Sequence, residues 1–415
     1  MSESRPRRLE DCITLVTEKV VRHKDSSLPY VGLEHIPSSG TSLLGTAAAQ
    51  DSVSANNVFR AGDILFGKLR PHLRKCIRVA FDGYCSMDIL VLRPKPGVDP
   101  RFAGFLMQSG LVFAAAIAAE EGTKMPRCSW SDLRGIQVPI PPLGVQTRIG
   151  IILTTLDKEI AQTEALIAKS QQIKAGLMHD LFTRGLTADG KLRPPCEEAP
   201  DLYKQSPLGW IPNDWRAEPL STVVPRVQYG ISDALDDGPG IPVLRMNNFA
   251  EGEADLSQLK YSSGSGARSL FLKVGDVLFN RTNSIDHVGR TGIWRGQLVE
   301  ASFASYLVRL EPDSSLLISE FLNLWLNLDS TQIRIRKGAT PSVHQVNINP
   351  TTLRRNLIAI PGLEEQSQVV VEVASARTVI QELRRTLQKL RSLKSAFMHD
   401  LLTGRVRVPV PKKEP

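Results

Sequence analysis

Two His-Asp pairs are the residues whose types and spacing come nearest to catalytic machinery. They are His179-Asp180 and His399-Asp400, each inside the tetrapeptide Met-His-Asp-Leu. A carboxylate can orient an imidazole for proton transfer, but neither pair has a nearby nucleophile or metal ligand in the sequence. Because both pairs are expected at helix ends, we predict a structural or partner-docking role for the two tetrapeptides, namely Met178, His179, Asp180, Leu181, Met398, His399, Asp400 and Leu401.

Other signatures of chemistry are missing from the sequence. It contains no GxxxxGK[ST] phosphate loop, no HExxH helix and no glycine-rich loop opening a strand-helix unit for a nucleotide cofactor. Asn349-Pro350 lacks the rest of the Asn-Pro-Pro-aromatic run that amino-methyltransferases use. The 5 cysteines form no CxxC pair, which indicates neither a zinc cluster nor a disulfide framework. We therefore predict a non-catalytic chain without a metal or a cofactor of its own.

The charge of the chain favours an anionic partner. The formal net charge is +8, and the basic residues gather in particular segments, for example between Arg377 and Lys394. Arg and Lys can bond guanine edges, Asn and Gln can bond adenine edges, and all four can hold phosphates. If the anionic partner is DNA, the candidate DNA-binding residues by this chemistry are Lys68, Arg70, Arg74, Lys124 and Arg127 in the first half, and Arg245, Asn247, Asn248, Asn280, Arg281, Asn283, Arg290, Lys337 and His344 in the second. Each of them could equally be a solvated surface charge or a loop-capping amide.

A tandem duplication must position these residues. The tetrapeptide repeats at a separation of 220 positions, and the same register aligns Gln146 with Gln366 and Lys174 with Lys394. Weaker matches continue outside it: AGDILF at 61–66 corresponds to VGDVLF at 274–279, and Leu9 is expected to match Leu220. The separation between matching residues changes there. We therefore expect two globular domains of differing sequence, here called heads, each joined to a copy of the repeated stretch. Both Gly-Asp pairs are interpreted as turns.

The repeated stretch is predicted to be a long helix in each copy. In the second copy the apolar positions from Val369 to Leu390 follow alternating steps of four and three, which is a heptad seam. In the first copy Thr163 and Ser170 interrupt the seam. Prolines precede both helices, and Gly185 and Gly404 follow them. The obvious cover for each apolar stripe is the other copy.

These patterns give a domain scheme for the chain of 415 residues. A first head covers residues 1–143, a central helix 144–184, a linker 185–206, a second head 207–362, a distal helix 363–403 and a basic tail 404–415. The linker is expected because 187–206 are rich in proline and charge and lack periodicity. No secretory signal or membrane-spanning run is found, so we expect a cytoplasmic protein.

At this point the sequence resembles a family, the specificity subunit of Type I restriction-modification systems. The resemblance is carried by GWIPNDW at 209–215, the GD[IV]LF strands, the Gly-x-Thr turns, IPPL and IPGL before Gln146 and Gln366, and the helix ends LMHDLFTRGL and FMHDLLTGRV. It covers essentially the whole chain and the order of its parts. Members of the family carry two target recognition domains separated by two long helices that pack antiparallel, an α+β fold with a pseudo-twofold axis.

The resemblance implies a function as well. Each recognition domain would read one half of a split double-stranded DNA site, and the coiled-coil-like helices would hold the two apart and dock two methyltransferase subunits. Restriction and translocation subunits would join them. S-adenosylmethionine, ATP and magnesium would be bound by these partners and not by this chain. Helix length would then set the spacing of the two half-sites, which must match the helical repeat of DNA.

Two other classes of function stay open from the sequence. One is a coiled-coil adaptor that does not read DNA. The other is a stand-alone DNA methyltransferase or nuclease with motifs that we do not see. An affinity for DNA that falls steeply as salt concentration rises would indicate the DNA-recognition subunit and not the adaptor, because phosphate contacts weaken with salt. Activity of the purified chain with S-adenosylmethionine or magnesium would indicate the enzyme.

Overall fold

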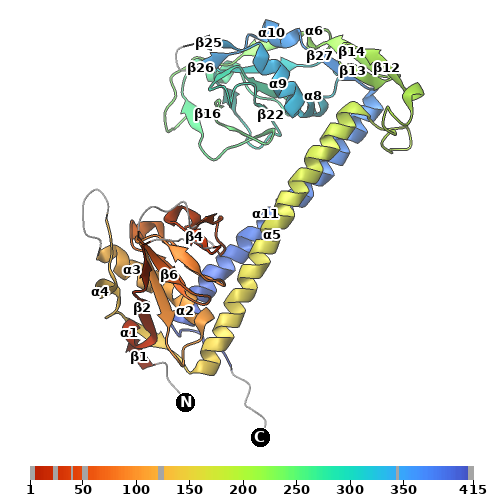
Figure 1. Ribbon diagram of the computed structural model, residues 1–415. Helices are drawn as coiled ribbons and strands as arrows, with labels where there is room; N and C mark the ends of the chain where they lie inside the picture. The colour runs from red at the N-terminus through yellow and green to blue at the C-terminus, as the bar shows by residue number, and fades with distance from the viewer. Residues whose placement is uncertain are drawn as a thin grey trace. The chain divides into compact units, whose positions relative to one another are not determined.

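The computed structural model describes residues 5–21, 27–38, 41–48, 55–119, 126–342 and 345–409. These residues form two compact units. Unit 1 comprises Met1–Ala168 with Glu382–Pro415, and unit 2 comprises Lys169–Gln381. Each unit therefore holds one head, the half of a long helix that follows this head, and the half of the other long helix. The predicted α+β class is confirmed, since both heads combine sheets with short helices (Figure 1).

The first head is built on a four-stranded sheet with the order β2-β10-β7-β8 and a five-stranded sheet with the order β3-β6-β9-β4-β5. Helices α2 (Pro100–Met107) and α3 (Gly110–Ala118) pack on the first sheet through Phe102, Leu106 and Phe113. The remaining bounds are β1 Arg5–Arg8, α1 Leu9–Cys12, β2 Ile13–Val16, β3 Lys19–Val20, β4 Pro29–Val31, η1 Leu33–His35, β5 Ala47–Ala48, β6 Asn56–Phe59, β7 Ile64–Gly67, η3 Pro71–Leu73, β8 Cys76–Arg78, β9 Gly83–Cys85, β10 Ile89–Pro94, α4 Trp130–Leu133 and β11 Gln137–Ile140.

The second head repeats this plan with additions. Its main sheet has the order β15-β24-β20-β22-β18-β17, and three-stranded sheets β19-β16-β23 and β21-β26-β25 accompany it. The bounds are η4 Pro200–Leu202, β12 Tyr203–Ser206, β13 Gly209–Pro212, β14 Arg216–Pro219, α6 Leu220–Val223, β15 Arg226–Tyr229, β16 Ile241–Leu244, β17 Phe249–Ala250, β18 Glu253–Ala254, β19 Lys260–Ser262, α7 Ser265–Ser269, β20 Val277–Asn280, β21 Thr282–Asn283, β22 Thr291–Ile293, β23 Ser302–Phe303, β24 Leu307–Glu311, α8 Ser319–Leu326, α9 Asp329–Lys337, β25 Thr340–Ser342, β26 Gln345–Asn347, α10 Pro350–Arg354 and β27 Leu357–Ile360.

The strand registers show that the heads are true copies. In the first head Ile64 pairs with Leu92 and Arg78, and in the second Val277 pairs with Leu310 and Ile293. Arg8 pairs with Gln137 just before Leu9, as Pro219 pairs with Leu357 just before Leu220. Leu9 and Leu220 are both fully buried. The expected match of these two leucines is thus confirmed by topology, where the sequence alone offers little identity.

The Gly-Asp pairs are turns, as predicted. Asp63 accepts a hydrogen bond from the backbone N–H of Arg60 and forms a 2.7 Å ion pair with Arg93 on β10. Asp276 repeats both contacts, with the N–H of Lys273 and with Arg309 on β24 at 2.7 Å. The carboxylate of each turn is therefore used to bind the neighbouring strand. Neither Asp63 nor Asp276 is available for chemistry.

Two long helices, α5 (Leu143–Thr183) and α11 (Leu363–Leu402), carry the heads. Each ends where Gly185 or Gly404 takes a positive φ, 63° and 75°, a conformation that glycine adopts without steric cost. In unit 1 the helices are antiparallel neighbours, since Asp157 bonds Lys394 and Glu164 bonds Arg391, both at 2.6 Å (Figure 1). The predicted interruption at Thr163 is tolerated because its hydroxyl donates to the carbonyl of Glu159 at 2.7 Å.

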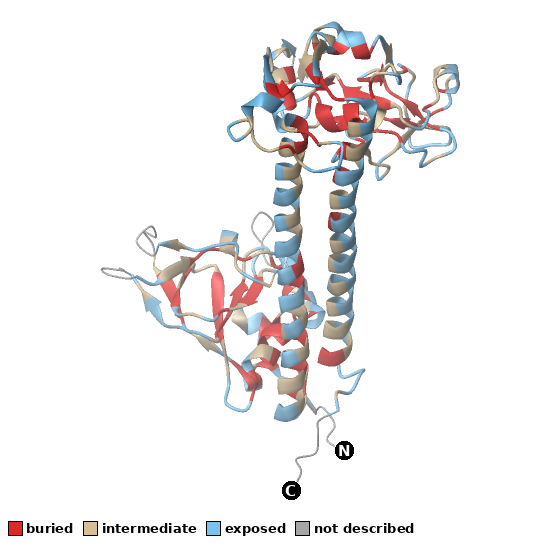
Figure 2. Ribbon diagram, turned by 90° about the vertical axis from the view of Figure 1, so that its right-hand side faces the viewer, coloured by how far each residue is buried: buried red, intermediate tan, exposed pale blue. Residues whose placement is uncertain are grey.

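Burial along the helices is concentrated near their ends, where each packs on a head (Figure 2). In unit 1 Leu153 of α5 and Leu401 of α11 enter the core of the first head. In unit 2 Leu181 of α5 and Val373 of α11 enter the core of the second head. The end of one helix and the start of the other thus complete each head, which makes both helices part of both folding cores.

The prediction of a linker at 185–206 needs correction. This segment belongs to unit 2, where β12 pairs with β13 and Leu186 is buried. Arg193, only 8% exposed, bonds the Glu365 carboxylate at 2.6 Å, and Glu365 also accepts the indole N–H of Trp215 at 3.1 Å. The prolines and charged residues of this segment suggested a solvated linker. Its Arg193 is instead paired in the interior with Glu365, a residue far along the sequence.

Among the described residues, no single helix is long and apolar enough to cross a membrane. The bent pair α2 and α3 reaches the required length and composition only when the two are taken together. Most of α2, from Phe102 to Met107, is buried in the head.

Candidate nucleic-acid interface

In the first head three of the candidate basic residues meet beyond the end of strand β7. Lys68 and Arg70 follow the strand, and Leu69 forms a β-bridge with Arg127. The backbone N–H of Arg70 donates to Pro126, and that of Cys128 donates to Lys68. Arg70 and Arg127 are exposed and Lys68 is half-buried. Arg127 has a 3.4 Å contact with Asp88, so three cations face one carboxylate at this edge.

In the second head Arg281 takes the place of Lys68. Each follows the last residue of the Gly-Asp strand, and each donates its backbone N–H at 3.0 Å to the residue preceding the paired strand region, Asp88 for Lys68 and Tyr306 for Arg281. The bridge from Leu69 to Arg127 corresponds to the pairing of Thr282 with Asn347. A long cation therefore stands at the same place in both heads, within loops that differ.

Most other candidates of the second head surround the same strand end. Asn283 follows on β21, and Asn280 exchanges backbone hydrogen bonds with the segment of Arg290. The turn of Arg245 and Asn247 lies beside them, because the Asn280 amide donates to the carbonyl of Met246 at 3.0 Å. Asn247, Arg290 and Lys337 are exposed. Lys337 ends α9, whose Arg336 donates to the carbonyl of Asp286 in the adjoining loop.

Two of the predicted contacts are contradicted by burial. Asn280 is fully buried, and Asn248 is 1% exposed. The Asn248 side chain accepts the backbone N–H of Arg245 and donates to Asp255, both at 2.9 Å, so it closes a turn. An amide that is withdrawn from solvent and spent on backbone groups cannot reach a base edge. In this structure both asparagines hold loop backbone groups, so their side chains are not placed to contact DNA.

Arg74 is placed apart from the other candidates of the first head. The short helix η3 separates it from Arg70, and its guanidinium lies 5.1 Å from the ring centroid of Phe113 on α3. Arg245 is half-buried and donates to the carbonyl of Gln258 at 2.7 Å. The Asn283 side chain accepts the N–H of Ser284. Lys124 and His344 lie outside the described residues.

Two tyrosines at this surface escaped the sequence analysis. Tyr229 and Tyr306 are 49% and 47% exposed, and the Arg281 guanidinium lies 5.3 Å from the centre of the Tyr229 ring. Exposed aromatic rings beside a cation suit contact with sugars and bases. A signal was present, because Tyr306 immediately precedes the strand that pairs with the Gly-Asp strand.

The docking tetrapeptides divide between core and surface. Leu181 and Leu401 are buried in the two head cores, so their side chains cannot meet a partner in this structure. His179 and His399 are exposed, while Met178, Asp180, Met398 and Asp400 are half-buried. Asp180 lies 3.7 Å from Arg184, and His399 lies 2.9 Å from Arg405. Met398 and His399 also line a groove of about 1300 Å³ with Leu111 of α3 and Arg74.

In each head one buried glutamine near the start of the long helix makes the same two hydrogen bonds to the head. The buried Gln146 accepts the N–H of Asp99 at 2.9 Å and donates to the carbonyl of Pro141 at 2.8 Å. Gln366 repeats this with the N–H of Ile318 at 2.8 Å and the carbonyl of Pro361 at 3.0 Å. The duplicated glutamine is thus a structural clamp between head and helix.

Asp99 strengthens this clamp in the first head only. Its carboxylate caps α2, binds Arg101 at 2.9 Å and accepts the hydroxyl of Thr147 on α5 at 3.0 Å. Burial alone would raise the pKa of Asp99, but hydrogen bonds from Arg101, Thr147 and two backbone N–H groups outweigh it and lower the pKa from 3.8 to about 2. The ionised form is therefore stabilised by folding.

Replacing Asp99 with alanine is expected to lower the free energy of unfolding by about 1–3 kcal/mol near neutral pH. Because the folded pKa is depressed, this contribution is complete above the unfolded pKa and is lost as the pH falls through 3.8 toward 2. Urea unfolding at pH 7 and at pH 3.5 would measure it. Asp132→Ala, at an exposed carboxylate in the first turn of the short helix α4, is the control. A deficit in Asp99→Ala that does not shrink at the lower pH would contradict the assignment.

The chain is similar in sequence to known proteins. Residues 11–174 match the model of the type I restriction modification DNA specificity domain. The chain is 27% identical over 206 residues to the putative type I restriction enzyme MjaX specificity subunit of Methanocaldococcus jannaschii, covering 48% of each chain. It is 22% identical over 341 residues to the StySPI specificity subunit of Salmonella potsdam, covering 80% of this chain and 70% of the relative. The chain is therefore similar to type I specificity subunits, and the DNA specificity domain model covers its residues 11–174.

The solved structures agree on the fold. A chain from the structure describing complex assembly and conformational transition of the type I R-M system has 21% identity and a TM-score of 0.59, covering 97% of this chain and 98% of that one. The type I restriction-modification S subunit from M. genitalium has 13% identity and a TM-score of 0.56, covering 96% of both. The match to the MjaX relative spans about half the length of that protein. The relatives are named specificity subunits, which agrees with the prediction that this chain is a non-catalytic subunit.

Proposed function

We propose that this chain reads a bipartite double-stranded DNA site, one half with each head, and docks the subunits that act on it. The observation that carries the proposal is the repeated cation beyond the Gly-Asp strand, Lys68 in one head and Arg281 in the other, each within loops of different sequence. A constant position with varied surroundings suits two readers that use one docking geometry on different half-sites.

The partners follow from the same proposal. Two methyltransferase subunits would dock on the helices and tetrapeptides, with exposed His179 and His399 and the groove at Met398 as contact surfaces. Restriction subunits would join this complex. S-adenosylmethionine, ATP and magnesium would be bound by these partners. The chain itself supplies DNA recognition and a frame, and it needs no catalytic group for either task.

Co-expression with an adenine methyltransferase subunit from the same host, followed by mapping of N6-methyladenine across the host genome, tests this proposal. The expected result is a split motif whose second half alone changes when residues 207–362 are exchanged for those of a relative. A stable complex of the two proteins without any methylation would reject DNA reading and favour the adaptor. Methylation by the purified chain without its partner would instead reveal an enzyme.

A further inference from the structure

In unit 2 a carboxylate of the chain itself fills the space between the head and α11. The loop from β16 to β19 places β18 beside β22, with Glu253 opposite Ile293. The Glu253 carboxylate bonds Arg377 of α11 and, at 3.2 Å, Arg295. Arg295 in turn bonds Glu320 of α8 at 3.1 Å. The charges at this site therefore balance, with the two acids Glu253 and Glu320 against the two arginines Arg295 and Arg377.

The duplication identifies the corresponding space in unit 1. Strand β8 corresponds to β22 by its register with β7, α2 corresponds to α8 by the glutamine clamp, and α5 corresponds to α11. Arg78 therefore stands where Ile293 stands in unit 2, Arg101 at Glu320, Asp157 at Arg377 and Lys158 at Thr378. At three of these positions a cation stands in place of an apolar residue, an acid and a hydroxyl, and at the fourth the acid Asp157 stands in place of a cation.

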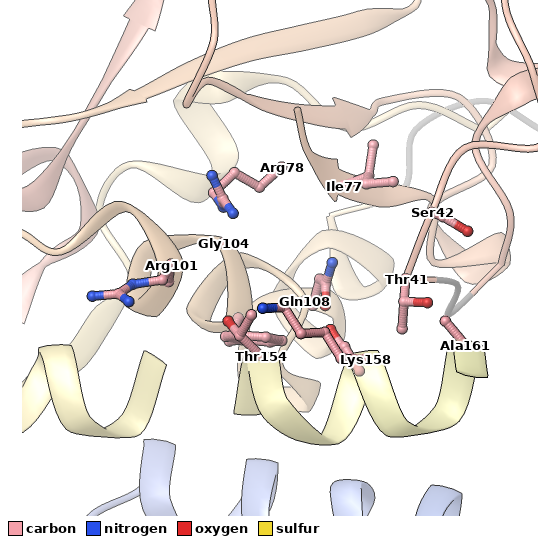
Figure 3. A pocket seen from close by; sticks show the side chains of 12 residues that line it. Thr41, Ser42, Ile77, Arg78, Arg101, Gly104, Gln108, Thr154, Lys158 and Ala161 are labelled. Atoms are coloured by element: carbon pink, nitrogen blue, oxygen red, sulfur yellow. The ribbon is translucent and has the colours of Figure 1, made fainter. Parts of the chain in front are cut away.

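Among the described residues that line this space in unit 1, none from the head is a carboxylate. The loop between β4 and β5, which corresponds to the loop that carries Glu253, brings Thr41 and Ser42 here. In the described ranges β8 pairs with β7 and is approached on its other side by Ser38, which bridges Lys75 just before the strand, whereas β22 has the strand β18 on that side. The result is a cavity of about 250 Å³, around which Figure 3 shows Arg78 from β8, Gln108 from the end of α2 and Lys158 from α5.

The charges around the cavity do not balance. Asp157 is paired with Lys394 at 2.6 Å, and Asp99 is paired with Arg101 at 2.9 Å. Arg78 and Lys158 remain, and neither side chain has an ion pair within the part of the chain that the structure describes. Arg78 is half-buried and Lys158 is exposed at the rim of the cavity. Two cations beside one space repel each other, and an anion between them would relieve this repulsion.

We propose that this cavity binds a carboxylate carried on an extended acidic segment of a partner protein, which lies along β8 as β18 lies along β22. Unit 2 shows the geometry that such a segment would adopt, including the carbonyl of Gly252, which accepts the Asn323 amide at 2.9 Å. In unit 1 Gln108 follows the corresponding helix, and its amide, which donates to the carbonyl of Cys76 at 3.1 Å, has a second N–H to offer. The inference rests on the proposed function only in requiring a protein partner.

The probe for this site is a labelled synthetic peptide with the sequence of residues 247–256, NNFAEGEADL, which contains β17 and β18. Its binding to the full chain is measured by fluorescence anisotropy. We expect Arg78→Ile and Lys158→Thr, the residues of unit 2, each to weaken binding about tenfold, or about 1.4 kcal/mol. A peptide with Glu253→Gln should weaken equally. Arg60→Ala, at an exposed cation elsewhere on the head, is the matched control.

Three outcomes would overturn the proposal. The first is that the peptide does not bind, and the second is that Arg78→Ile and Lys158→Thr bind it as tightly as the parent chain does. The third is that duplex DNA displaces the peptide and binds Arg78→Ile more weakly than the parent, which would make the cavity a phosphate site. Thermal unfolding of the two variants serves as the folding check, and neither should be less stable than the parent. Normal methylation of the split motif without peptide binding would reject this inference and leave the proposed function intact.

Discussion

Glu365→Ala is expected to lower the free energy of unfolding of unit 2 by about 3–5 kcal/mol, because it removes one partner of a buried ion pair. The Glu365 side chain is 11% exposed and that of Arg193 is 9% exposed. The carboxylate also accepts the N–H of Leu186 at 2.7 Å and the indole N–H of Trp215 at 3.1 Å. Its loss would leave the N–H of Leu186 and the indole N–H of Trp215 without their acceptor, and the Arg193 guanidinium with Asp214 alone as its ion-pair partner.

Glu364→Ala is the matched control for this prediction. Both acids lie in the first turn of α11 and interact alike with the helix dipole, but Glu364 is exposed. The control should change stability by less than about 1 kcal/mol. Chemical unfolding of the full chain, followed by tryptophan fluorescence, measures both, since Trp215 contacts Glu365 directly. Equal effects of the two substitutions would show that the carboxylate contributes only through the helix dipole.

Lys68→Ala and Arg281→Ala are expected to weaken recognition of different halves of one DNA site. A cation that holds a phosphate or a guanine edge contributes about 1–3 kcal/mol, so each variant should bind the mapped duplex roughly 5- to 150-fold more weakly. The double variant should show the product of the two effects, because the residues lie in separate heads. Arg281 has the clearer surroundings for such a contact, beside Tyr229 and Tyr306.

The measurement is the dissociation constant for a duplex carrying the methylated motif, at several salt concentrations. A cation that holds a phosphate should reduce the salt slope by about 1, whereas one that reads a base should relax the motif at one position. Arg268→Ala is the control, since Arg268 is an exposed cation of the same head on α7. If Arg281→Ala binds as Arg268→Ala does, the strand end is not the reading surface.

Periodic and local features were predictable because their physical causes lie within short stretches of chain. The heptad pattern predicts helices at 144–184 and 363–403, and the structure has α5 and α11 at Leu143–Thr183 and Leu363–Leu402. The seam is observed at Ile149, Leu153 and Ile160, all buried. Gly-Asp before an apolar run indicated a turn, and Asp63 and Asp276 form it. Proline before a helix and glycine after it act on the local backbone alone.

The sequence by itself therefore determined the duplication, the helix pair, the turns and the resemblance to the specificity subunits. Only the tertiary structure decided what each polar side chain does. Asn280 and Arg281 are adjacent and equally polar, yet the first is buried and the second reaches the surface. Arg193 finds Glu365 at a separation of 172 residues, and Arg377 finds Glu253 at 124. Whether a charge is solvated, paired or left facing a cavity depends on which distant segments exclude water from it, and no local pattern contains that information.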